Sequence, residues 1–308
     1  MPVQNRSLEY ALLGCLALLW GSSYMWISLA LETIPPATLI AIRVALACAV
    51  LLAIMAFRGI RMPLDKRSWW QFFVQSLVNS TGPWLLLAWG QQYAGTAVSS
   101  VLNSTSPLWV FALSYLLLKS GQRPGRLQFT GAMAGFCGIV LIVGVGALED
   151  IGQNLLPQLA VLFSAVLYGF AALRGRVFSG LPPIVSAIGT LLCSCLVLIP
   201  MSLIADRPWQ LEPDLTALGA AAILGIACTA LAFLIYFRLL RTLGPMGTAS
   251  QAYLRSGIGV FLGVVFLSET LDLETFAGIC LAIFGVVLIN WPKNNKSQVT
   301  PAVGKEVS

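Results

Sequence analysis

The chain has 308 residues, of which 58% are hydrophobic and 10% are charged, and its formal net charge is +6. Soluble domains carry about 25% charged residues, so this composition excludes a soluble protein and indicates an integral membrane protein. The sequence contains no histidine, which removes the usual proton shuttle near neutral pH and the most frequent metal ligand. We expect neither a metal nor another cofactor.

Ten apolar segments are long enough to cross a bilayer, for which a helix needs ~20 residues. They cover residues 8–31, 36–57, 69–92, 95–118, 127–147, 154–173, 182–204, 215–237, 245–268 and 273–291. The short connections between them leave no room for a soluble domain. The sequence therefore predicts an all-α integral membrane protein with ten transmembrane helices, followed by a disordered cytoplasmic tail over residues 293–308.

The first two spans contain three residues that are unusual at membrane depth. Trp20 and Tyr24 lie one helical turn apart in the first span, where they are placed to line a cavity or to pack against neighbouring helices. Arg43 lies within the second span, on a helix without a polar stripe. We favour a structural role for Arg43, with Glu32 or loop carbonyls as its partners.

The third and fourth spans carry polar residues at helical spacing. In the third span Asn79 precedes Trp84, and the Gly82-Pro83 pair predicts a kink that frees backbone carbonyls. In the fourth span one helix face is formed by Thr96, Ser99, Asn103 and Pro107. Such a face turns away from lipid, toward the interior of the bundle.

A related pattern occurs in the second half of the chain. Tyr168 lies deep in the sixth span and Tyr236 in the eighth, while the ninth span repeats the polar stripe with Thr248, Gln251, Arg255 and Gly259. We therefore predict a solute cavity between the two halves. Its predicted lining consists of Trp20, Tyr24, Asn79, Trp84, Ser99, Asn103, Tyr168, Tyr236, Gln251 and Arg255.

Arg255 is the most conspicuous of these residues, because an arginine at the centre of a span costs about 2.5–3.5 kcal/mol on insertion scales. It lies about eight residues from the expected cytoplasmic start of its helix, or ~12 Å, at the limit of a snorkelling side chain. Two interpretations stay open. Arg255 bonds carbonyls of a neighbouring helix or reaches cytoplasmic water, or it attracts the carboxylate of a solute, which its fork geometry suits.

Basic residues are concentrated in alternate connections between the spans. Of the 18 lysines and arginines, 15 fall on one side of the membrane, whereas nine of the 12 acids fall on the other. The positive-inside rule makes the basic side cytoplasmic, so we expect both termini in the cytoplasm and the chain in the cell inner membrane. The net charge thus reports topology and does not indicate a nucleic-acid partner. The expected partners are the lipid bilayer and a small-molecule solute, and the oligomeric state is left open.

Two halves of the sequence are similar to each other. The segment GTAVSSVLNSTSPLWVF from Gly95 aligns with GTASQAYLRSGIGVFLG from Gly247, and FTGAMAGFCGIVLI from Phe129 aligns with FAGICLAIFGVVLI from Phe276. Because each half holds five spans, an odd number, homologous halves must lie in opposite orientations. We predict a first five-helix repeat over residues 1–152 and an inverted second repeat over 153–292, an arrangement typical of transporters.

These segments together resemble the drug/metabolite transporter superfamily, in particular its ten-helix EamA-type exporters. The features are LLWGSSY in the first span, PATLIAIRVALA in the second, AWGQQYAGTAVSSVLNSTSPLW across the third and fourth, and FLSETLDLETFAGICLAIFGVVLI at the end. Within the superfamily the chain is similar to the YddG-type exporters of aromatic amino acids. It departs from the family pattern where Gly259 stands opposite Pro107, and where Lys119 replaces an acid that Glu269 represents in the second half.

No carboxylate occupies the middle of a span, although proton-coupled carriers usually have one there. This favours facilitated transport and counts against a carrier of organic cations. The sequence thus predicts a secondary transporter that exports amino acids, aromatic or otherwise apolar, and related small metabolites by alternating access. A multidrug or nucleotide-sugar carrier of the same fold is one alternative, and a membrane receptor or structural protein is another. An enzyme is not expected, because histidine, mid-span acids and a GxSG-type motif are absent from the sequence.

Overall fold

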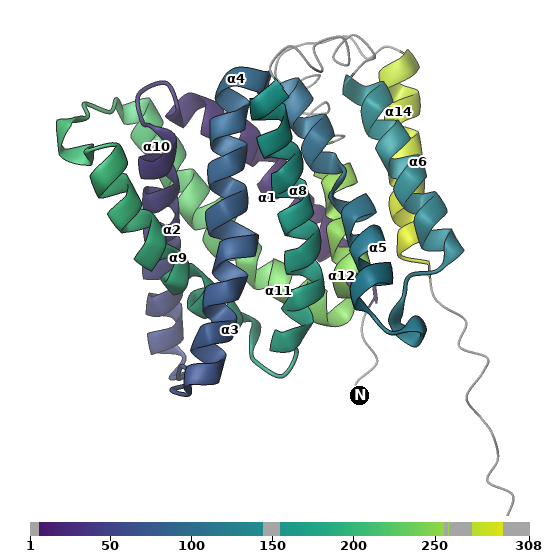
Figure 1. Ribbon diagram of the computed structural model, residues 1–308, viewed down its shortest axis with the longest axis horizontal. Helices are drawn as coiled ribbons and strands as arrows, with labels where there is room; N and C mark the ends of the chain where they lie inside the picture. The colour runs from purple at the N-terminus through teal and green to yellow at the C-terminus, as the bar shows by residue number, and fades with distance from the viewer. Residues whose placement is uncertain (1–5, 144–154, 256–257, 259–272, 292–308) are drawn as a thin grey trace, which may run out of the picture.

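The computed structural model describes residues 6–143, 155–255, 258 and 273–291, and every regular element within these ranges is helical. The first half contains α1 (Arg6–Ala30), α2 (Pro36–Phe57), α3 (Lys66–Ser76), η1 (Leu77–Thr81), α4 (Gly82–Ser104), α5 (Ser106–Leu117), η2 (Ser120–Gln122) and α6 (Arg126–Val143). The second half contains α8 (Leu155–Arg174), η3 (Gly175–Phe178), α9 (Pro183–Ala205), η4 (Pro208–Gln210), α10 (Leu215–Gly225), η5 (Ile226–Leu231), α11 (Ala232–Thr242), α12 (Gly244–Ala249) and α14 (Leu273–Ile289). The helices form a bundle in which α4 and α8 stand near the centre (Figure 1).

Several helices are long and apolar enough to cross a membrane. In the part of the chain that the structure describes, these are Arg6–Ala30, Pro36–Phe57, Leu155–Phe178, Pro183–Ala205 and Leu215–Thr242, with Arg126–Ile142 and Leu273–Ile289 as shorter apolar helices. The chain is therefore a multi-pass membrane protein. The end of the predicted fifth span, half of the predicted ninth span including Gly259, the following Glu269, and the predicted tail lie outside the described residues.

The third and fourth spans are helical from Lys66 to Ser104, yet the chain reverses direction within this stretch. Contacts of residues 75–90 with α8 proceed backward along that helix, from 171 to 157, whereas those of residues 103–109 proceed forward, from 164 to 169. The two parts therefore run antiparallel to each other. This agrees with the predicted division into two spans between residues 92 and 95.

The third and eighth spans each contain a π-helical segment, η1 and η5 respectively. In η1 the wider turn is closed by the Gly82 N–H, which donates to the Leu77 carbonyl. A Cβ on Gly82 would stand 2.7 Å from that carbonyl oxygen, so the close approach requires glycine. The irregularity expected at Gly82-Pro83 thus begins one turn earlier, and π-helical turns of this kind are frequent at functional sites.

Polar contacts join helices at both ends of the bundle. At one end Glu9 is buried, forms an ion pair of 2.8 Å with Arg238, and accepts a hydrogen bond of 2.8 Å from the Thr242 hydroxyl. At the other end the Asp206 carboxylate accepts from the N–H and the hydroxyl of Thr38, at 2.6 and 2.9 Å. These contacts connect α1 with α11 and α2 with the end of α9.

Helices α6 and α14 lie side by side at one edge of the bundle (Figure 1). They approach so closely at glycines that a Cβ on Gly131 would stand 2.7 Å from the Gly285 carbonyl oxygen, and one on Gly138 2.7 Å from that of Gly278. Gly131, near the start of α6, contacts Gly285, near the end of α14, whereas Gly138 farther along α6 contacts Gly278 closer to the start of α14. The two helices are therefore antiparallel. Small residues at such an interface allow close backbone packing within a membrane.

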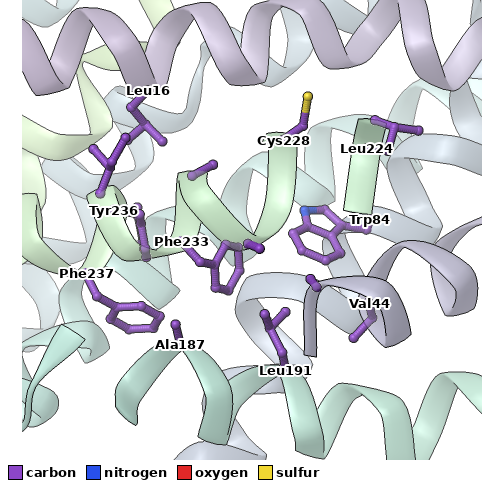
Figure 2. Close-up of a cluster of buried hydrophobic side chains, with 14 of the residues drawn as sticks. Leu16, Val44, Trp84, Ala187, Leu191, Leu224, Cys228, Phe233, Tyr236 and Phe237 are labelled. Carbon is purple, nitrogen blue, oxygen red and sulfur yellow. The ribbon is translucent and has the colours of Figure 1, made fainter. Parts of the chain in front are cut away.

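A run of buried aromatic side chains joins the two halves inside the bundle. The Trp84 ring of α4 lies 5.5 Å from the Phe233 ring of α11, and Phe233 lies 6.0 Å from Tyr236 and 5.8 Å from Phe237. Figure 2 shows this run between the surrounding helices, with Cys228 and Leu16 nearby. The packing fixes the positions of Trp84 and Tyr236, whose other sides face the cavity described next.

Candidate solute-binding cavity

A cavity lies between the two halves and encloses about 710 Å³ of space, the opening at its mouth included. Nine of the ten residues predicted from the sequence line it: Trp20, Tyr24, Asn79, Trp84, Asn103, Tyr168, Tyr236, Gln251 and Arg255. The tenth, Ser99, is fully buried and is not part of the lining. Arg43, Ser23, Ser106 and Thr248 also line the cavity.

Arg255 connects the polar stripes of the fourth and ninth spans. Its Nη2 donates a hydrogen bond of 2.6 Å to Asn103 Oδ1, and the amide nitrogen of Asn103 donates one of 3.3 Å to Ser164 Oγ on α8. The guanidinium carbon lies 5.4 Å from the centre of the Tyr24 ring. Arg255 thus faces the cavity, and its one described hydrogen bond goes to a side-chain amide rather than to a backbone carbonyl.

Arg43 also reaches the cavity, and its predicted partners were wrong. Its Nε donates to Thr229 Oγ1 at 2.6 Å and its Nη2 to the Cys228 carbonyl at 3.4 Å, while its guanidinium carbon lies 4.1 Å from the centre of a Trp84 ring. Both hydrogen-bond acceptors belong to η5, so neither Glu32 nor a loop holds this side chain. A single charge in an apolar helix gives no periodic signal, which is why the sequence did not place Arg43 in the lining.

Three lining residues have a buried polar atom with no hydrogen-bond partner among the described residues. They are the Tyr24 hydroxyl, the Asn79 amide nitrogen and the Gln251 amide oxygen. Buried polar groups are nearly always paired in folded proteins. Unpaired groups that face one cavity from both halves are therefore suited to bind a polar solute.

Aromatic side chains form much of the remaining wall. Trp20 and Tyr236 have ring centres 5.4 Å apart, and the Trp20 indole donates to the Cys228 carbonyl at 3.0 Å. Tyr168 lines the same cavity as Arg43 and Arg255. The wall can thus hold a flat or apolar group next to fixed positive charge.

Tyr253, the neighbour of Arg255 in sequence, does not face the cavity. Its ring is fully buried against Gly135 of α6, and its hydroxyl donates to the Ala132 carbonyl at 2.8 Å. Tyr253 is two residues from Arg255 and from Gln251, and residues two apart point to different sides of a helix. Tyr253 therefore packs on a different side of the helix from Arg255 and Gln251, as helix periodicity requires.

A multi-pass helical bundle with an internal, polar and aromatic cavity is typical of membrane transporters. The model of the EamA-like transporter family matches the chain twice, over residues 8–144 and 155–291. The chain therefore belongs to the EamA-like transporter family, which confirms the resemblance and the presence of two repeats.

Relatives of the chain extend over nearly its whole length. The "Uncharacterized inner membrane transporter YedA" of Escherichia coli (strain K12) is 25% identical, covering 92% of this chain and 91% of the relative. The "Uncharacterized transporter YoaV" of Bacillus subtilis (strain 168) is 22% identical, covering 87% and 92%. A solved structure titled "Crystal structure of protein" has a TM-score of 0.76 at 20% identity, covers 92% of this chain and 96% of its own, and shows the same fold. Neither relative's name specifies a solute.

Proposed function

We propose that this transporter exports small metabolites, foremost amino acids with aromatic or other apolar side chains, from the cytoplasm by alternating access. The observation that carries the proposal is the 2.6 Å hydrogen bond between Arg255 and Asn103. It brings the polar stripes of both halves to one cavity. Stripes that faced different directions would have favoured a receptor or a structural protein.

Alternating access requires two halves that can rock around a central site, and inverted repeats provide them. Gly131 aligns with Gly278 and Gly138 with Gly285 in the two halves. In the structure Gly131 contacts Gly285 and Gly138 contacts Gly278. Each contact therefore joins one residue to the repeat equivalent of the other, as a two-fold axis between two antiparallel helices requires. A two-fold relation of this kind, with its axis in the membrane plane, supports an inverted arrangement of the repeats.

The lining suits a solute with an acid group at one end and an apolar or aromatic group at the other. Arg255 is placed to bind a carboxylate, and the rings of Trp20, Tyr24 and Tyr236 are placed to hold the apolar part. Gln251 offers a buried amide oxygen as an acceptor for an ammonium group. An amino acid with an aromatic side chain combines all three features.

The substitution Arg255→Ala tests this proposal. Because the carboxylate loses its cationic partner, we expect flux of labelled phenylalanine into proteoliposomes to fall by about tenfold or more. Expression and monodispersity in detergent should remain close to wild type, because Arg255 makes only one described hydrogen bond. Unchanged flux in a well-folded variant would refute a carboxylate-binding role. The same assay with and without a pH gradient determines whether transport is proton-coupled or facilitated.

A further inference from the structure

Two arginines from different halves of the chain share one cavity. Arg43 comes from α2, and Arg255 follows α12 in the second half. None of the described residues that line the cavity is acidic, and neither arginine forms an ion pair within the described ranges. The described part of the lining therefore carries two positive charges and no negative one. In the low-dielectric interior of a membrane protein these charges repel each other more strongly than they would in water.

Among the described residues, neither guanidinium group uses all of its hydrogen-bond donors. The described hydrogen bonds use two of the five N–H donors of Arg43 and one of the five of Arg255. Each group is also held beside an aromatic ring, Arg43 at Trp84 and Arg255 at Tyr24. The two guanidinium groups are thus held in place before a solute binds, so less side-chain entropy is lost on binding.

Neutral donors complement the two cations. The Asn79 amide nitrogen and the Tyr24 hydroxyl are buried in the lining without a partner among the described residues. Both can donate to an anionic oxygen. A zwitterionic amino acid would neutralise only one arginine with its carboxylate and would add a further positive charge. A solute with two acid groups would neutralise both arginines.

We propose that the cavity prefers small organic anions with two acid groups over zwitterions of similar size, and that Arg43 is the residue that creates this preference. The inference rests on the proposed export of small metabolites, and within that group it ranks solutes with two acid groups above amino acids with a single one. Arg255 binds one acid group, as it would in an amino acid, and Arg43 binds the second.

The net charge of the solute also determines in which direction the membrane potential drives its transport. A membrane potential that is negative inside drives anions outward, by a factor of about 50 in the equilibrium ratio for each charge and each 100 mV. A facilitated carrier of such anions would therefore act as an exporter without a buried carboxylate for proton coupling. This agrees with the lack of an acidic residue in the described lining.

The experiment uses the full chain in proteoliposomes and four probes that share a phenyl ring but differ in charge. They are phenethylamine (cation), phenylalanine (zwitterion), phenylacetate (monoanion) and phenylsuccinate (dianion). We expect wild-type flux of phenylsuccinate to exceed that of phenylalanine by about tenfold. A valinomycin-induced potassium diffusion potential, negative inside, should accelerate phenylsuccinate efflux and leave phenylalanine efflux unchanged.

Substitutions separate the two arginines. Arg43→Gln should lower the ratio of phenylsuccinate flux to phenylalanine flux by about tenfold or more, whereas Arg255→Gln should lower both fluxes and change this ratio much less. The matched control is Arg174→Gln, since Arg174 bonds Gln71 near the end of α8 and is not in the lining. It should alter neither flux. If Arg43→Gln does not give monodisperse protein, Arg43→Lys, which keeps the charge, should retain the dianion preference with weaker binding.

Two results would overturn the inference, and they are distinguishable. Equal or faster wild-type flux of phenylalanine than of phenylsuccinate, or an Arg43→Gln variant that keeps the wild-type ratio of the two fluxes, contradicts the charge preference while leaving the proposed export of amino acids intact. Flux of none of the four probes contradicts the proposed function itself, and the inference falls with it.

Discussion

The π-helical segments η1 and η5 occupy corresponding places in the third and eighth spans, but their polar side chains differ in hydrogen bonding. In η1 the Asn79 amide nitrogen and the Thr81 hydroxyl are buried and unpaired within the described structure. In η5 the Thr229 hydroxyl accepts from Arg43 and donates to the Leu224 carbonyl. The same backbone irregularity thus leaves an unpaired donor in one half and holds the Arg43 guanidinium group in the other.

This difference has a physical basis in the partners that each segment meets. A buried arginine needs acceptors, and the wider turn of η5 supplies both a hydroxyl and the Cys228 carbonyl, which also accepts from Trp20. No cation reaches Asn79 in the described structure, so its amide remains available. Because the halves are unequal in this way, we expect a solute with unlike ends to fit the cavity better than a symmetric one.

The largest effect on stability is expected for Thr229→Val. Valine keeps the shape of threonine but leaves the buried Arg43 Nε and the Leu224 carbonyl without their partner, which should cost about 3 kcal/mol of unfolding free energy. Thr81→Val is the matched control, because the Thr81 hydroxyl has no described partner to lose. Thermal unfolding in detergent measures both. Equal destabilisation by the two substitutions would mean that the Arg43–Thr229 bond is not what distinguishes η5 from η1.

A smaller effect is expected for Gly82→Ala. The added Cβ would stand 2.7 Å from the Leu77 carbonyl oxygen, so the π-helical turn of η1 must shift, at a cost of about 1–3 kcal/mol. Gly219→Ala in α10 is the control, because no described atom lies within 4 Å of its added Cβ. We expect a lower unfolding temperature and reduced transport for Gly82→Ala alone. Wild-type transport by this variant would show that the π-helical geometry of η1 is not needed.

The smallest effect on stability, with a clear effect on transport, is expected for Asn79→Leu. The substitution removes an unpaired buried amide, so the unfolding free energy should change by less than about 1 kcal/mol. Solute flux should nevertheless fall, because the cavity loses a donor. Parallel unfolding and proteoliposome measurements test this separation. A variant that loses stability and transport together would show that Asn79 is structural, as Thr229 is.

Helix periodicity predicted which face of a helix a side chain lies on, but not whether that part of the face borders the cavity. Ser99 and Asn103 share a face of the fourth span, yet only Asn103 lines the cavity, while Ser99 is fully buried outside it. Spacing along a helix gives the angle at which a side chain leaves the axis, but not the level at which two helices separate. The pairing of Arg43 with η5 joins residues 186 positions apart in sequence, a contact that no local pattern encodes.

The sequence by itself determined that the chain crosses a membrane and that its two halves are related, and it predicted most of the polar and aromatic residues that line the cavity. These properties follow from composition and periodicity, since lipid excludes unpaired polar groups along each helix separately. Only the tertiary structure decided that Arg43 and Arg255 meet in one cavity without a described acid, and that η1 and η5 treat their polar groups differently. The balance of charge and hydrogen bonds in a cavity is a property of several helices together, and it exists only after they have packed.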